Sequence, residues 1–223
     1  MLPLNLAPPR GRPLRVLAFG AHSDDIEIGC GGTLLQFRAA KAEIHWVVMS
    51  GSEQRQAEAR RGARLFLGSS GIERVRLFSF RDGFFPAQFG EIKEAFEDVG
   101  RRVQPDVVFT HFRDDRHQDH RVLSDLAWNT FRRQLILEYE VPKWDGDLSR
   151  PNCYVPLSRS EADRKIRGLM VAFGSQRSKD WFDAETFRGL MRLRGVECRA
   201  ASGLAEAFYA RKVTFNPGKG ARA

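Results

Sequence analysis

Several features that would assign this chain to a membrane or secreted class are missing from its sequence. No apolar run approaches the ~20 residues that a membrane-spanning helix needs. Residues 1–13 contain four prolines and no apolar core of signal-peptide length, so we expect a flexible segment and no cleaved signal. Cysteine is scarce: Cys30, Cys153 and Cys198 are far apart and odd in number, which fits neither a disulfide framework nor a CxxC metal pair. These absences predict a cytoplasmic protein without a membrane span.

The charge is biased toward positive, with 36 basic and 28 acidic residues and a net charge of +8. Such an excess can indicate a protein that binds nucleic acid. Here the arginines are scattered along the predicted helices, and no basic run alternates with aromatic residues as a stacking platform would. We therefore expect solvated basic surfaces that attract small anionic ligands, and no nucleic-acid partner. A basic α/β protein that binds DNA or RNA is the alternative from a different functional class.

Short apolar segments alternate with amphipathic ones along the first 137 residues. Predicted strands cover residues 14–20, 44–49, 75–80 and 107–110. Predicted helices begin near Thr33 and cover residues 53–67, 92–103 and 122–131. This alternation is typical of an α/β, Rossmann-like fold: a mostly parallel sheet with helices on both faces. In the usual strand order, 3-2-1-4, the first and fourth strands are neighbours.

The pattern changes from Glu138 onward. A short strand is predicted at residues 153–155, and helices at 162–173, 184–194 and 204–209. We interpret residues 14–223 as one domain, with a core at 14–137 and a C-terminal extension at 138–215 that walls the ligand pocket. The whole chain is long enough for one such domain.

Two polar clusters follow the first and fourth predicted strands. Residues 20–27 read GAHSDDIE, and residues 117–120 read HQDH. Buried carboxylates are costly unless they are paired or bind a metal. His117 and His120 are three residues apart and share one face of a helical turn. Because ligands bind beyond the carboxyl ends of neighbouring strands, we expect the clusters to meet and hold one divalent ion. Imidazole and carboxylate ligands suit Zn²⁺, Fe²⁺ or a similar ion.

The two clusters also carry a family resemblance. AHSDD at residues 21–25, with Glu27, resembles the AHPDDxE signature of the LmbE-like (PIG-L) N-deacetylases, and HQDH resembles their HPDH signature. Ser23 and Gln118 replace the prolines of these signatures. Proline stiffens a loop and binds no metal, so the replacements concern loop rigidity. The likeness extends from Leu14 to about Phe215. Features similar to the branch with the bacillithiol-pathway deacetylases are Arg55, Glu58, Asp82-Gly83, Ser175-Gln176, Arg194-Gly195 and residues 205–208.

The resemblance implies a role for each residue of the clusters. His22, Asp25 and His120 would bind zinc, and Asp24 would be the general base. His117, steadied by Asp119, would protonate the leaving amine or stabilise the oxyanion. The chemistry agrees, since zinc lowers the pKa of a bound water to near 7 and a neighbouring carboxylate can then take its proton. We expect Asp119 to raise the pKa of His117.

The implied reaction removes an N-acetyl group from an amino sugar such as an N-acetylglucosamine glycoside. Arg55 and Asp82 are the candidate substrate-binding residues, Arg55 for an anionic group and Asp82 for a sugar hydroxyl. Their alternatives are a surface pair of Arg55 with Glu58 and an Asp-Gly turn. The second hydrolase hypothesis is an amidase for a non-sugar or longer-chain N-acyl compound. A homo-oligomer is compatible with the resemblance.

Simpler structural roles compete for several residues. Asp24 is a good helix cap as well as a candidate base. Asp114 and Asp115 could be fourth metal ligands, but we expect them to cap a helix. His111 could also be a ligand, but we expect it to lie in a loop or pocket wall, and we expect His45 to lie in the core.

The glycines at residues 29, 31 and 32 invite a dinucleotide-binding interpretation. The acidic residues before them occupy the approach that a pyrophosphate would need, so we do not expect bound NAD.

Overall fold

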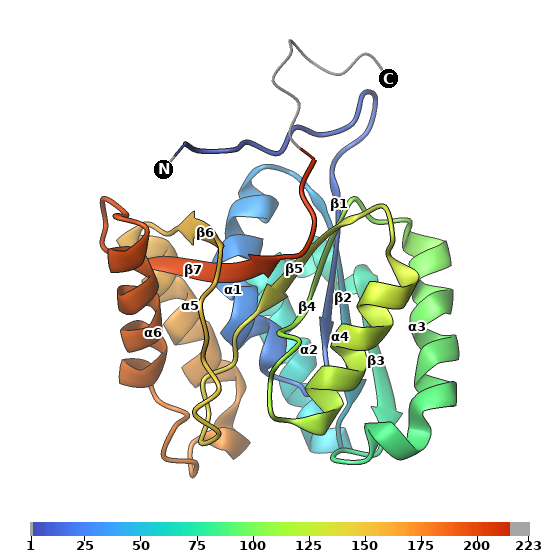
Figure 1. The fold of residues 1–223 in the computed structure, drawn as a ribbon. Helices are drawn as coiled ribbons and strands as arrows, with labels where there is room; N and C mark the ends of the chain where they lie inside the picture. Colours follow the sequence, from blue (N-terminus) through green and yellow to red (C-terminus); the bar gives the residue numbers. More distant parts are fainter. Residues whose placement is uncertain (1, 215–223) are drawn as a thin grey trace.

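The computed structural model describes residues 2–214 and contains a seven-stranded sheet with the order β3-β2-β1-β4-β5-β7-β6 (Figure 1). The strands are β1 (Arg15–Gly20), β2 (Glu43–Ser50), β3 (Val75–Phe80), β4 (Val107–His111), β5 (Leu135–Tyr139), β6 (Cys153–Pro156) and β7 (Ala205–Ala210). Strands β1 to β5 are parallel, and β7 is antiparallel to both β5 and β6. The predicted Rossmann-like sheet and its 3-2-1-4 order are confirmed.

Helices cover both faces of the sheet. They are α1 (Asp25–Ala39), α2 (Glu53–Leu67), α3 (Phe89–Val103), α4 (Gln118–Thr130), α5 (Arg159–Ala172) and α6 (Ala184–Glu197). Short 3-10 helices are η1 (Ser69–Arg74), η2 (Phe85–Gln88) and η3 (Gly174–Gln176). Alternate residues of β1 enter two apolar cores: Val16 and Ala18 pack with α1, α2, α5 and α6, whereas Leu17 and Phe19 pack with α3 and α4. This two-sided burial explains why the strands read as continuous apolar runs.

The segment before β1 is joined to the start of β4. Arg12 donates two hydrogen bonds of 2.7 Å to the carboxylate of Asp106. The same carboxylate accepts the backbone N–H of Arg15 at 2.9 Å. Among residues 2–214, no helix combines the length and apolar character required to cross a membrane.

Helix α1 begins eight residues earlier than the predicted start at Thr33. The glycines at residues 29, 31 and 32 precede the predicted start but lie inside this helix, where they allow close packing. A Cβ on Gly29 would come within 2.0 Å of the Tyr139 ring, and one on Gly31 within 2.6 Å of the Phe66 ring. Glycine therefore serves here to bring α1 against β5 and α2, and the predicted boundary was wrong.

Two strands of the extension were not predicted correctly. Strand β5 was missed because Glu138 interrupts its apolar pattern. The helix predicted at residues 204–209 is strand β7, so that prediction was wrong. Its sequence, Ala-Glu-Ala-Phe, has a local preference for helix, but β7 pairs with both β5 and β6. Tertiary pairing overrides local propensity in such cases.

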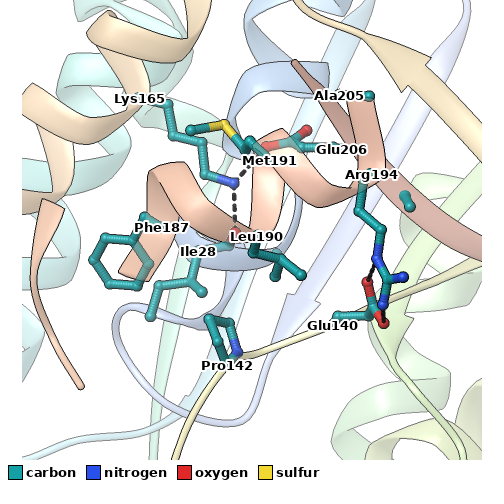
Figure 2. A pocket seen from close by; sticks show the side chains of 12 residues that line it. Ile28, Glu140, Pro142, Lys165, Phe187, Leu190, Met191, Arg194, Ala205 and Glu206 are labelled. Atoms are coloured by element: carbon teal, nitrogen blue, oxygen red, sulfur yellow. Dashed lines mark hydrogen bonds and ion pairs between the residues drawn. The ribbon is translucent and has the colours of Figure 1, made fainter. Parts of the chain in front are cut away.

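Buried ion pairs join the elements of the extension to one another, and one of these pairs, Lys165 with Glu206, also hydrogen-bonds to helix α1 of the core (Figure 2). Lys165 on α5 donates to Glu206 on β7 at 2.6 Å and to the carbonyl of Ile28 at 2.5 Å. Glu206 also accepts the backbone N–H of Thr33 in the middle of α1 at 2.6 Å. Nearby, Arg194 on α6 pairs with Glu140 after β5. Removing one partner of such a pair typically costs ~3–5 kcal/mol, so these contacts fix the extension's position.

The packing of α1 against β5 can be tested with two glycine substitutions. Gly29→Ala should lower the free energy of unfolding by at least ~1–3 kcal/mol, because its methyl group would overlap the Tyr139 ring. The matched control is Gly189→Ala on α6, where a Cβ would meet nothing within 4 Å. That change should stabilise the protein by up to ~1 kcal/mol. Urea denaturation of both variants measures the difference, and equal effects would contradict the packing described.

Candidate active site

The two polar clusters meet where β1 and β4 end. Strand β1 leads into α1, and β4 leads through a loop into α4, so the sheet places both helix starts at one edge. Residues of both clusters line one cavity of about 830 Å³. The C-terminal extension completes its wall with residues 141, 143–145, 176, 179 and 181. The predicted meeting of the clusters is confirmed.

Three donor atoms form a compact triangle at the base of this cavity. The Nδ1 atom of His22 lies 3.2 Å from Nε2 of His120 and 3.3 Å from Oδ2 of Asp25. The third side, between Nε2 of His120 and Oδ2 of Asp25, is 3.6 Å. A tetrahedral ion with bonds of 2.0–2.2 Å separates its ligand atoms by ~3.3–3.6 Å. The triangle therefore has the dimensions of one face of a tetrahedral site.

Both histidines of the triangle have a carboxylate on their other ring nitrogen. Nε2 of His22 lies 3.0 Å from Asp82 and 3.4 Å from Asp119. Nδ1 of His120 lies 2.8 Å from Oδ2 of Asp115. Metal-bound histidines commonly place their second N–H on a carboxylate, which fixes the tautomer and orients the ring. With a proton on each of these outer nitrogens, Nδ1 of His22 and Nε2 of His120 would present their lone pairs to an ion.

The charges around the triangle shift the pKa values of its members in opposite directions. Burial disfavours the charged form of His22, but Asp25, Asp119 and Asp82 outweigh this and raise its pKa well above the usual value. Burial and the neighbouring His111 lower the pKa of His120 to about 3. Three histidines outweigh the burial of Asp25 and hold its pKa well below the usual value. Asp25 is therefore ionised and His120 neutral at pH 7, the forms that bind a metal, whereas His22 is protonated in the metal-free site and would release its proton to an incoming ion.

Asp24 lies beside the triangle and lines the same cavity. It occupies the N-cap position of α1, yet its side chain makes no capping hydrogen bond. Its Oδ1 atom instead accepts from Nη2 of Arg55 at 2.7 Å. Burial raises the pKa of Asp24, and the guanidinium of Arg55 opposes this increase. The Asp24 side chain therefore does not cap α1, and it lines the cavity instead.

His117 has a different environment from the one expected. Its Nδ1 accepts the backbone N–H of Asp119 at 3.3 Å, whereas the Asp119 carboxylate accepts from the backbone N–H groups of Gly83 and Phe85. Asp119 therefore holds the loop after β3. The pKa of His117 is lowered, not raised, because burial and the nearby His22 outweigh the carboxylates. The predicted direction was wrong. A neutral His117 with Nδ1 as acceptor carries its proton on Nε2.

Both candidate substrate-binding residues line the cavity. Arg55 donates to Asp24, to Glu58 at 2.8 Å and to Ser175 at 3.2 Å, so it joins α2 to the base of the site and to the extension. The alternative role predicted for Arg55, a pair with Glu58, is therefore present as well. The Arg55 side chain is mostly buried, however, and does not lie on the surface. The side chain of Asp82 is largely exposed at the rim, next to His22.

Asp115 and Lys143 form a support that the sequence did not reveal. Helix α4 begins at Gln118 with His117 as its N-cap, so the predicted capping by Asp115 was wrong. Asp115 is buried and accepts from Nδ1 of His120 and from Nζ of Lys143 at 3.0 Å. Lys143 comes from the extension and also pairs with Asp147 at 2.7 Å. The spacing of Asp115 five residues before His120 was the available signal. Asp114 is exposed.

Two further histidines differ from expectation. His111 is the last residue of β4, is completely buried and does not line the cavity, so the predicted loop or wall position was wrong. Its Nε2 accepts the backbone N–H of Ala21 at 3.0 Å and lies 3.2 Å from Asp25, beneath the triangle. His45 is only half-buried and bonds to Glu43 at 2.7 Å, which corrects its predicted place in the core.

Comparison with known proteins identifies the family. A sequence profile of the GlcNAc-PI de-N-acetylases (PIG-L) matches residues 17–131, a segment that contains both clusters. The chain belongs to the PIG-L family. It is also 34% identical over 142 residues to the uncharacterized deacetylase YaiS of Escherichia coli (strain K12), covering 57% of this chain and 74% of YaiS.

Solved structures with this fold have more than one activity. The N,N′-diacetylchitobiose deacetylase of Pyrococcus horikoshii matches with a TM-score of 0.69 at 22% identity, over 87% of this chain and 82% of that one. GalB, the 4-carboxy-2-hydroxymuconate hydratase of Pseudomonas putida KT2440, matches with 0.72 at 20% identity, over 92% and 100%. At these identities the likeness establishes the fold, and function must be argued from the site.

The low pKa of His120 predicts a pH-dependent loss of stability in metal-free protein. Because the pKa of His120 is about 3 in the folded protein and about 6.5 for an ordinary histidine, the unfolded chain takes up this proton first as the pH falls. The contribution of neutral His120 to the free energy of unfolding is therefore fully present above pH 6.5 and is lost as the pH falls toward 3. Between pH 7 and 5, the unfolding free energy of EDTA-treated protein should fall by ~1–2 kcal/mol more than that of His120→Gln. Equal pH slopes in urea denaturation would refute this assignment.

Proposed function

We propose that the protein is a metal-dependent hydrolase that removes the N-acetyl group from an N-acetylated amino sugar. The observation that carries this proposal is the donor triangle of His22, Asp25 and His120 with the Asp24 carboxylate beside it in one cavity. Membership of the PIG-L family and the similarity to the deacetylase YaiS support the reaction type. No dinucleotide is expected in this cavity, because its base is acidic.

The triangle would hold Zn²⁺, or Fe²⁺ or another divalent ion with similar preferences. A set of two imidazoles and one carboxylate is typical of catalytic zinc sites, which leave one position for water or substrate. An ion held there would lower the pKa of a water molecule and polarise the acetamide carbonyl. Three other groups of donor residues among residues 2–214 overlap the triangle: His22, His117 and His120; His22, Asp82, His117 and Asp119; and Asp25, His111 and His120. His111 is a poorer ligand than His22, because its Nε2 lone pair accepts the N–H of Ala21.

The proton transfers follow from the positions of Asp24 and His117. Asp24 accepts a proton from the attacking water on Oδ2, since Arg55 occupies Oδ1. His117 donates its Nε2–H to the carbonyl oxygen as negative charge develops there. The proton on Asp24 then passes to the nitrogen as the C–N bond breaks, which releases acetate and a free amine. This sequence uses neutral His117 as a hydrogen-bond donor and needs no imidazolium.

The substrate-binding roles of Arg55 and Asp82 remain part of the proposal. The Asp82 carboxylate at the rim can accept a hydrogen bond from a sugar hydroxyl. Arg55 is held by three protein acceptors, so its charge acts on the substrate from the wall of the cavity. Arg81 and Lys179 also line the cavity; they lie over the rings of Phe84 and Trp181, and neither forms an ion pair with a carboxylate of residues 2–214, which favours an anionic substrate. An acyl-length series tests the alternative, an amidase for longer N-acyl compounds.

Replacing the proposed base tests the mechanism. Asp24→Asn should lower kcat for free-amine release from N-acetylglucosamine glycosides by about 10²–10⁴-fold, the usual effect of losing a general base. The metal content should stay at the wild-type level, because Asp24 lies outside the donor triangle. Amine detection and metal analysis on the same preparation provide both values. A fully active Asp24→Asn variant would rule out Asp24 as the base.

Replacing a proposed ligand tests the metal site. His120→Ala should lose bound metal and activity together, because one corner of the triangle is removed. The matched control is His45→Ala, which removes a histidine on β2 that bonds only to Glu43. The control should retain wild-type metal and turnover. One metal ion per chain in purified His120→Ala would show that the ligand set is wrong.

A further inference from the structure

Trp144 is the most exposed aromatic side chain of residues 2–214, with 67% of its surface accessible, and it lines the candidate active-site cavity. It lies in the connection between β5 and β6, within the C-terminal extension. An exposed indole contributes little to the stability of the fold, because its apolar surface stays in water. Because it also lines the cavity, the indole is available to contact a bound ligand.

The indole is held in place from two sides although it is exposed. Its Nε1–H donates to Oδ1 of Asp180 at 2.7 Å, and its ring packs edge-on against Trp181, with centroids 5.9 Å apart and planes at 84°. Asp180 and Trp181 belong to the connection between α5 and α6. Two separate segments of the extension thus fix one flat aromatic face at the mouth of the cavity. A surface ordered in advance costs less entropy when a ligand binds.

The neighbouring residue connects this face to the site. Lys143 points inward, where its Nζ pairs with Asp115, and Asp115 in turn holds His120. Two successive residues of this turn therefore have different roles. Lys143 contacts Asp115, which orients a histidine of the donor triangle, and Trp144 lies exposed in the wall of the cavity. Trp144 and the residues of the triangle line the same cavity, so one ligand can contact both.

We infer that Trp144, backed by Trp181, forms a subsite that stacks against a ring-shaped aglycone of the substrate. The inference rests on the proposed function, which places the acetylated sugar at the donor triangle. The face of an indole is electron-rich and attracts the C–H groups of a sugar ring or the edge of an aryl ring. A cavity of about 830 Å³ is large enough for a second ring beside the first. The substrate class is accordingly a disaccharide or an aryl glycoside of N-acetylglucosamine type.

Three glycosides test whether Trp144 stacks against a second ring and whether that ring is a sugar or an aryl group. Methyl N-acetylglucosaminide has no second ring, N,N′-diacetylchitobiose has a second sugar, and phenyl N-acetylglucosaminide has an aryl ring. For the wild-type protein, kcat/KM for at least one ring-bearing substrate should exceed that for the methyl glycoside by about tenfold, mainly through KM. In Trp144→Ala this ratio should fall close to one, and Trp144→Phe should retain most of it. The control is Trp128→Ala, an exposed tryptophan on α4 outside the cavity, which should keep the wild-type ratio.

Calorimetric binding of the corresponding free amines separates this inference from the proposed function. A preference for the ring-bearing amine that depends on Trp144 supports the subsite even if no substrate is deacetylated, a result that would refute the proposed function alone. A ratio unchanged in Trp144→Ala, with deacetylation intact, overturns the subsite alone. Absence of both turnover and binding preference overturns both. A Trp144→Ala variant that keeps the ratio and dissociates into smaller assemblies would assign Trp144 to a contact between copies, which also overturns the subsite.

Discussion

The site depends on one buried carboxylate, that of Asp25, at the junction of the two halves of the sheet. Only 3% of Asp25 is exposed, and its Oδ2 accepts the backbone N–H of His22 at 2.6 Å. The side chains of His111 from β4 and His120 from α4 approach the same oxygen. A buried anion of this kind is stable only with compensating partners, so its environment draws β1 and β4 together. A divalent cation would complete this compensation.

Buried or partly buried carboxylates with polar partners also connect the elements around the site. Asp115 orients His120, and Lys143 from the extension compensates Asp115. Asp119 joins the loop after β3 to α4, and Arg55 joins α2 to Asp24. The extension is therefore part of the site as well as its wall. Its attachment through Lys165 and Glu206 to the peptide groups of α1 connects the stability of the fold with the geometry of the site.

The sequence was sufficient for the part of the protein in which local pattern and topology agree. The apolar strands and the two polar clusters predicted the 3-2-1-4 order and the meeting of residues 22–25 with 117–120. The sequence was insufficient where contacts between distant segments determine the type or the boundary of an element. Gly29 is a helical residue that has no side chain where the Tyr139 ring lies, and Glu206 belongs to strand β7, which pairs with β6 at this residue and with β5 two residues later. The contact of Lys143 with Asp115 spans 28 residues, which no local pattern encodes, whereas Asp115 lies only five residues before His120.

Anomalous diffraction at the zinc edge, from crystals of the protein loaded with zinc, tests the central claim most directly. The account predicts one peak per chain, bonded to Nδ1 of His22, a carboxylate oxygen of Asp25 and Nε2 of His120. A peak among His22 Nε2, Asp82, His117 and Asp119, whose donor atoms also lie within 4.8 Å of one another, would contradict it. In that case Asp82 and Asp119 would be ligands, and the proposed division of the site between metal binding and proton transfer would be wrong.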